Sequence, residues 1–214
     1  MKLSCTVHGP RALPRSSPFS PHLVLTSHVK FAPFATRQRR GYIRDSSERD
    51  ISVHLETALR AAVLADQWPK SGVEVIVTVI EGDYEGCLMP SKRDERWDMM
   101  NILGACITVA SAAIIDAGID CIDSVTGGVA ALVRTSVDAA PILVLDPAVS
   151  ESTAVLAACC VAYLPSRDEI SCVWLKGQLP ASDSTSHLRL VGMATRAAKG
   201  TNQPLLGGLN ESLS

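Results

Sequence analysis

Aromatic residues make up only 4% of this 214-residue chain, and its seven cysteines follow no recognisable pattern. No two cysteines form a Cys-x-x-Cys pair, and no histidine lies at zinc-ligand spacing from them, which argues against a zinc module. An odd number of scattered cysteines, mostly within apolar runs, also argues against a disulfide framework and favours reduced thiols in an intracellular protein. The first residues contain no apolar run of the length that a secretory signal needs. The cysteines are Cys5, Cys87, Cys106, Cys121, Cys159, Cys160 and Cys172.

Only one hydrophobic run needs to be considered as a membrane span. Met99–Ile115 carries no charge over 17 residues, but Asp98 and Asp116 close it at both ends and several polar residues interrupt it. A membrane-spanning helix usually needs about 20 strongly apolar residues. We therefore expect a soluble protein, with no membrane partner, in which this segment is a buried core helix.

The net charge of −2 hides an uneven distribution. Residues 1–45 contain eight lysines and arginines and one acid, for a net charge of +7, whereas residues 46–214 carry −9. Such an asymmetry indicates one region suited to a polyanion.

Hydrophobic periodicity predicts an α+β protein with a mixed sheet packed against helices. Expected strands are Leu3–Val7, Leu23–Phe34, Val73–Ile80, Val125–Arg134, Pro141–Leu145, Ala154–Leu164 and Ile170–Leu175. Expected helices cover residues 48–65, started by Ser47 with Asp50, residues 98–117, and a last segment from Ser182 or Ser184 to Lys199. The Gly/Asn/Ser-rich residues 200–214 are expected to be a flexible tail.

Several short motifs follow one another along the chain: Val29-Lys-Phe-Ala-Pro-Phe-Ala35, Arg39-Arg-Gly41, Leu55-Glu-Thr-Ala-Leu59, Ala105-Cys-Ile-Thr108 and Ala112-Ala-Ile-Ile-Asp-Ala-Gly118. In this order they resemble the RNase PH family of phosphorolytic 3′→5′ exoribonucleases. The resemblance covers residues 2–178 and is strongest to the eukaryotic RNA exosome ring subunits of the mRNA-transport-regulator type. It implies the RNase PH-like fold, also called ribosomal protein S5 domain 2-like, as one domain over residues 1–199. The family begins with strands that precede the segment matching Lys2–Val7, so the resemblance implies a domain whose first strands are missing.

The resemblance also indicates where phosphate would bind in an active member of the family. An arginine in a Gly-Gly-Thr-Arg-like turn at the start of the second long helix binds inorganic phosphate, and the matching segment here is Met100–Gly104. Leu103 stands at the arginine position and donates no hydrogen bond. Lys92, Arg93 and Arg96 lie a loop away and are interpreted as a solvated charged loop.

Two carboxylates would hold a divalent metal in an active member of the family. The matching positions are Ser152 and Ala158, whereas Glu151 lies in the neighbouring position and would face the opposite side of a strand. Asp146 precedes a proline and is typical of a turn acid. We therefore expect no catalytic residues, no metal and no cofactor.

Arg37, Arg39, Arg40 and Arg44 are the candidate RNA-binding residues. A basic loop before a capped helix suits contact with a phosphate backbone regardless of sequence. The alternative is that these arginines pair with Asp45, Glu48 and Asp50. Tyr42 is either a base-stacking residue or a buried aromatic.

The expected function is that of a non-catalytic structural subunit of the RNA exosome ring, which contributes to 3′–5′ RNA processing and degradation, including rRNA processing. Its expected partners are other RNase PH-like ring subunits, RNA-binding cap subunits and RNA, in the nucleus, the nucleolus and the cytoplasm. Two alternatives remain open. One is an active phosphate-dependent exoribonuclease, and the other is a free-standing RNA-binding protein, which the scarce aromatics and modest charge disfavour.

Overall fold

A computed structural model describes residues 1–35, 39, 41, 43, 45–82, 95–134, 140–147, 155–177 and 185–213, with the backbone alone for residues 95–98, 212 and 213. The strands in these residues are β1 (Lys2–Ala12), β2 (Val24–Phe31), β3 (Ser71–Glu81), β4 (Thr126–Val133), β5 (Ile142–Leu145), β6 (Val155–Leu164) and β7 (Glu169–Gly177). The helices are α1 (Ser46–Arg60), α2 (Glu95–Asp116) and α3 (Ser186–Leu213), and a 3₁₀ turn, η1 (Ala65–Gln67), precedes β3.

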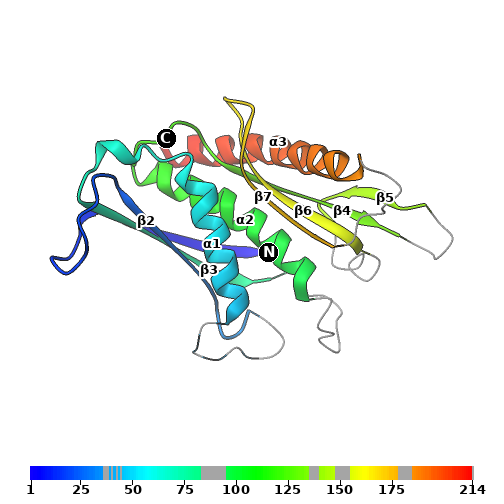
Figure 1. The fold of residues 1–214 in the computed structure, drawn as a ribbon, viewed down its shortest axis with the longest axis horizontal. Helices are drawn as coiled ribbons and strands as arrows, with labels where there is room; N and C mark the ends of the chain where they lie inside the picture. The colour runs from blue at the N-terminus through cyan, green and yellow to red at the C-terminus, as the bar shows by residue number, and fades with distance from the viewer. Residues whose placement is uncertain are drawn as a thin grey trace.

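The elements are arranged in four layers, in the order sheet, helices, sheet, helix (Figure 1). The first sheet has the strand order β1-β3-β2, and the second has the order β5-β4-β6-β7. Helices α1 and α2 lie between the two sheets, and α3 covers the far side of the second sheet. The predicted α+β architecture is confirmed, although the strands divide between two sheets instead of forming one.

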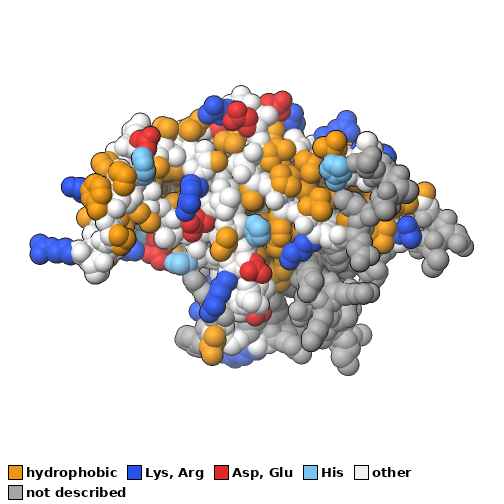
Figure 2. Space-filling model, viewed as in Figure 1, with side chains coloured by type: hydrophobic (Ala, Val, Ile, Leu, Met, Phe, Trp, Pro, Cys, Tyr) orange, Lys and Arg blue, Asp and Glu red, His pale blue; other side chains and the backbone are white. Residues whose placement is uncertain are grey.

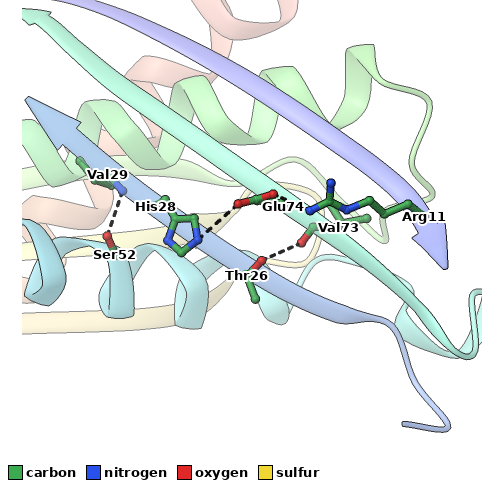
Figure 3. A network of polar contacts seen from close by, with 7 residues as sticks. All are labelled: Arg11, Thr26, His28, Val29, Ser52, Val73 and Glu74. Atoms are coloured by element: carbon green, nitrogen blue, oxygen red, sulfur yellow. Dashed lines mark hydrogen bonds and ion pairs between the residues drawn. The ribbon is translucent and has the colours of Figure 1, made fainter. Parts of the chain in front are cut away.

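The first sheet is mixed, because β3 pairs in parallel with β2 and in antiparallel with β1. Alternate valines of β3, Val73, Val75, Val77 and Val79, are buried against the helices. On the opposite face, Glu74 joins all three strands, since its carboxylate lies 2.7 Å from Arg11 of β1 and 3.4 Å from His28 of β2 (Figure 3).

Helix α1 begins and ends earlier than its sequence predicts. Asp45 is the N-cap residue and Glu48 closes a capping box, so the predicted start at Ser47 with Asp50 is wrong. The Glu48 carboxylate also accepts a 3.1 Å hydrogen bond from the backbone of Phe31. The Ser52 hydroxyl accepts a 2.9 Å hydrogen bond from the backbone N–H of Val29, and this bond connects α1 to β2 (Figure 3).

Helix α2 has no polar face because it packs against both sheets and α1. Its residues Met99–Asp116 meet the length and composition of a membrane span, but 56% of that segment is buried within the protein. The sequence prediction of a core helix is confirmed.

Strand β4 is buried along its whole length between α2 and α3. Two adjacent glycines allow this close packing, since consecutive residues of a strand face opposite sides of a sheet. A Cβ atom on Gly127 would lie 2.1 Å from the carbonyl oxygen of Gly104 in α2. A Cβ atom on Gly128 would lie 2.2 Å from the carbonyl oxygen of Ala194 in α3.

Helix α3 continues to Leu213, so the prediction of a flexible tail from Gly200 is wrong in its secondary structure. The buried stripe of Leu190, Ala194 and Ala198 is extended by Leu205, and the Thr201 hydroxyl donates a 3.3 Å hydrogen bond to the carbonyl of Gly127. The burial of Leu205 and the hydrogen bond from Thr201 to β4 stabilise the helix beyond Gly200. The predicted start at Ser182 or Ser184 lies outside the described residues.

Candidate functional site

The segment that corresponds to the family's phosphate-binding turn, Met100–Gly104, lies in the first half of α2, and most of its residues are buried. Leu103 is only 1% exposed and belongs to the main hydrophobic cluster, which fills the space between the two sheets. A leucine side chain offers no hydrogen bond to an anion, and an unpaired charge in such apolar surroundings is strongly disfavoured. Leu103 therefore cannot replace the arginine that the family uses to bind phosphate.

An active member of the family would carry metal-binding carboxylates at the positions of Ser152 and Ala158. The structure describes only the second of these positions. Ala158 is 2% exposed in β6, where it pairs with Ala131 of β4 inside the core. Ser152 and Glu151 lie outside the described residues. Asp146 directly follows β5 with a φ angle of +46°, and its backbone N–H donates a 3.0 Å hydrogen bond to Val129. Aspartate tolerates this left-handed conformation better than most residues, as expected of a turn acid.

A cavity of about 840 Å³ opens beside this part of α2, bounded by β4, the end of β5 and α3. Its polar side chains include Asn101, whose amide nitrogen donates a 2.8 Å hydrogen bond to the carbonyl of Pro147. The amide oxygen of Asn101 is buried and has no hydrogen-bond partner among the described residues. Among the described residues that line the cavity, Asp146 has the only charged side chain, and Met1 lies there as well. These residues therefore provide no lysine or arginine side chain for inorganic phosphate or an RNA backbone.

No group of three or more metal-ligating side chains occurs among the described residues. The cysteines that the structure describes are free thiols, and Cys87 lies outside it. Burial raises the pKa of the Cys106 thiol to about 12 and the pKa of the Cys5 thiol to about 11. Both thiols are thus protonated at neutral pH, in the form that is neither a good nucleophile nor a metal ligand.

The predicted RNA-binding loop is described only in part. Arg39 is exposed, whereas Arg37, Arg40, Arg44 and Tyr42 lie outside the described residues. Two of the three acids that the alternative interpretation pairs with these arginines have other roles in α1. Asp45 caps the helix, and Glu48 is buried and bonded to the backbone of Phe31.

Sequence reasoning missed the cavity and the amide oxygen of Asn101 that is buried beside it. The cavity arises where segments far apart in the sequence, α2, β4 and α3, come together. A polar asparagine within the uncharged run of α2 was the one signal available, and by itself it does not indicate a cavity.

The layered sheet–helix–sheet–helix arrangement is that of an RNase PH-like protein. The chain belongs to the RNase PH family: residues 1–120 match the family described as "3′ exoribonuclease family, domain 1". It is 59% identical to the "Exosome complex component MTR3" of Chaetomium thermophilum over 213 residues, which cover 100% of this chain and 75% of that protein.

Two further comparisons extend this result. The chain is 36% identical to the "Exosome complex component mtr3" of Schizosaccharomyces pombe over 127 residues, 59% of this chain and 44% of that protein. Its structure is similar to that of rice (Oryza sativa) Rrp46, with a TM-score of 0.68 at 16% identity, over 95% of this chain and 83% of the rice chain. The family resemblance and the RNase PH-like fold predicted from the sequence are both confirmed.

Proposed function

We propose that this protein is a non-catalytic structural subunit of the RNA exosome ring and contributes to 3′–5′ RNA processing and degradation. The observation that carries this proposal is the 59% identity, over the whole chain, to a protein named as an exosome component. Its partners are the other RNase PH-like ring subunits, RNA-binding cap subunits and RNA. It acts in the nucleus, including the nucleolus where rRNA is processed, and in the cytoplasm.

The residues at the family's catalytic positions support a non-catalytic role. Phosphorolysis needs a cationic group that binds inorganic phosphate and a metal that stabilises charge on the leaving oxygen. Leu103 and Ala158 supply neither, and both are packed in the core, where a small side-chain movement does not make room for phosphate. The subunit therefore contributes shape and contacts to the ring instead of chemistry.

Contact with RNA is assigned to the basic loop that contains Arg37, Arg39, Arg40 and Arg44. Arg39 is exposed, and the loop belongs to residues 1–45, which carry a net charge of +7. Arginine is well suited to bind phosphate through two parallel hydrogen bonds. The loop thus provides contacts that position RNA without reading its sequence.

Reconstitution with the other ring and cap subunits tests the assignment to the ring. We expect one copy of this chain in each assembled ring, measured by native mass spectrometry. We also expect that this chain contributes no phosphorolysis. Any phosphate-dependent release of nucleoside diphosphates from RNA by the ring should therefore not require this chain. Phosphorolysis that depends on this chain would support the alternative of an active exoribonuclease and would refute the non-catalytic role.

Charge reversal at Arg39 and Arg40 tests the RNA contact. The Arg39→Glu, Arg40→Glu variant should assemble normally but bind single-stranded RNA more weakly. The dependence of log K on log salt concentration should become shallower by about 1.4, which corresponds to two lost phosphate contacts. The matched control reverses two exposed arginines outside the loop, Arg15→Glu and Arg196→Glu. If both variants bind RNA equally, or if the first fails to assemble, the loop is not the RNA contact.

A further inference from the structure

The connection between β1 and β2, residues 13–23, contains both of the Ser-Pro pairs in the chain, Ser17-Pro18 and Ser20-Pro21. The sequence has no Thr-Pro pair. We call this connection the β1–β2 loop. It projects from one end of the first sheet (dark blue, left in Figure 1), and Figure 2 shows a basic side chain projecting from the same end of the molecule. A serine followed by a proline is the acceptor that proline-directed protein kinases recognise, so each of the two serines is a candidate for phosphorylation.

The hydroxyl of Ser17 is available to a kinase. It makes no hydrogen bond within the part of the chain that the structure describes. The backbone N–H of Ser17 donates a 2.9 Å hydrogen bond to the carbonyl of Pro14, which closes a short turn, and the neighbours Ser16 and Pro18 are exposed. Pro18 also disfavours the helical conformation at Ser17 and has no N–H that needs an acceptor in a kinase cleft. Ser17 is therefore presented in an irregular, exposed segment.

Ser20 is held at the base of the same loop. Its hydroxyl donates a 2.7 Å hydrogen bond to the carbonyl of His22, and its own carbonyl accepts a 3.2 Å hydrogen bond from the backbone N–H of Lys70. Both bonds must break before Ser20 can enter the cleft of another protein. The structure thus distinguishes two serines that have the same local Ser-Pro sequence.

Two cations lie beside Ser17. Arg15 is exposed, belongs to the same short turn, and forms no ion pair among the residues that the structure describes. The Nζ atom of Lys70 lies 5.5 Å from the centre of the Phe19 ring, two residues after Ser17. A phosphate close to lysine or arginine is stabilised by charge-assisted hydrogen bonds. A phosphate on Ser17 would therefore find a partner without any change in the fold.

We propose that Ser17 is a phosphorylation site for a proline-directed serine/threonine kinase and that Arg15 pairs with the phosphate. The Ser17 Oγ attacks the γ-phosphorus of ATP, and the bond from that phosphorus to the β–γ bridging oxygen breaks. ADP leaves, and the hydroxyl proton passes to the catalytic aspartate of the kinase. The phosphate adds a charge of about −1.5 to −2 at pH 7, so the net charge of residues 1–45 falls from +7 to about +5. This inference goes beyond the proposed function and does not depend on it.

The test treats the purified full chain with ATP and, separately, with a cyclin-dependent kinase and a mitogen-activated protein kinase. Tandem mass spectrometry locates the phosphate. We expect it on Ser17, with about tenfold less on Ser20, because two hydrogen bonds restrain Ser20. Ser17→Ala and Pro18→Ala should each remove most of the incorporation. The matched control, Ser16→Ala, changes the adjacent exposed serine, which no proline follows, and should leave incorporation unchanged.

Phosphorus NMR of the phosphorylated chain tests the contact with Arg15. The cation should hold the second pKa of the phosphate below its usual value of about 6. Arg15→Gln should raise that pKa by about 0.5, the size expected for a surface ion pair. Arg196→Gln, which changes an exposed arginine of α3, should leave it unchanged.

Phosphate on Ser20 or Ser16 in preference to Ser17 would overturn the proposal, and so would a chain that neither kinase phosphorylates. Equal titration of the phosphate in the Arg15→Gln and Arg196→Gln variants would refute the pairing with Arg15. Circular dichroism of each variant checks that the fold is kept. All of these measurements use the free chain, so their outcome is independent of assembly into a ring.

Discussion

Replacing Gly128 with alanine should destabilise the protein more than any ordinary glycine-to-alanine change. Gly128 lies in β4 directly beneath α3, and its new Cβ atom would lie 2.2 Å from the oxygen of Ala194 and 2.3 Å from the nitrogen of Ala198. Unstrained contacts between such atoms are about 3.5–4.0 Å apart. The obstructing atoms belong to the helix backbone, which cannot rotate away as a side chain can. The helix must therefore move by more than one ångström from the strand.

The cost of this movement follows from the packing that it disturbs. Over-packing of a core usually costs about 1–3 kcal/mol, and a collision with backbone belongs at the upper end of that range. We therefore expect the free energy of unfolding to fall by about 3 kcal/mol. For a chain of this length that loss corresponds to a decrease in melting temperature of about 6–12 °C.

A second glycine provides the matched control. Gly192 lies in α3 itself, and nothing lies within 4 Å of a Cβ atom placed there. Gly192→Ala should stabilise the helix by about 0.5–1 kcal/mol, because alanine loses less backbone entropy on folding. Urea denaturation of the full chain, followed by tryptophan fluorescence, measures both variants. Equal stability of Gly128→Ala and the unaltered chain would refute the assigned packing of α3 on β4.

Two further predictions concern polar contacts. Ser52→Ala should lower the free energy of unfolding, measured by urea denaturation, by about 1–3 kcal/mol, because it leaves the buried backbone N–H of Val29 without its acceptor. The control variant Thr57→Ala removes an exposed hydroxyl from the same helix and should change this free energy by less than about 0.5 kcal/mol. A larger effect at Thr57 than at Ser52 would contradict the role of Ser52 in joining α1 to β2. Hydrogen bonds from Tyr163 and Lys199 lower the pKa of Asp168 below its usual 3.8, so the carboxylate adds stability above that pH and loses it as the pH falls through the lowered pKa. Lys199→Met should therefore reduce the acid sensitivity of unfolding below about pH 4, and an unchanged pH profile would exclude this contribution.

Helices and strands were predicted correctly where the local hydrophobic pattern and the tertiary packing favour the same structure. The alternation of β3 and the uncharged run of α2 are regular, and both elements were predicted within a few residues. The end of α3 was missed because Gly200, Pro204 and Gly207 are weak helix formers. Burial of Leu205 and the hydrogen bond from Thr201 to β4 maintain the helix there, and neither contact is visible in local propensity.

The functional residues, too, were predicted only in part from the sequence. Leu103 and Ala158 were assigned to the family's site positions from the resemblance, because they occupy fixed places relative to recognisable motifs. The uncovered apolar side chains of β7 were not predicted, because the alternation of β7 is that of any half-buried strand. Only the structure shows that α3 is positioned over β4 and β6, so that Val173 and Leu175 are left uncovered.

Leu103 of α2 bears on both the proposed non-catalytic role and the stability of the fold. A fully buried leucine contributes about 1.5–3 kcal/mol to folding, whereas an arginine at the same place is stable only with a bound anion or another polar partner. Leu103 thus adds to the core between the two sheets without needing a ligand. The core at this position therefore needs no bound phosphate to be stable, which agrees with the proposed role of a structural subunit.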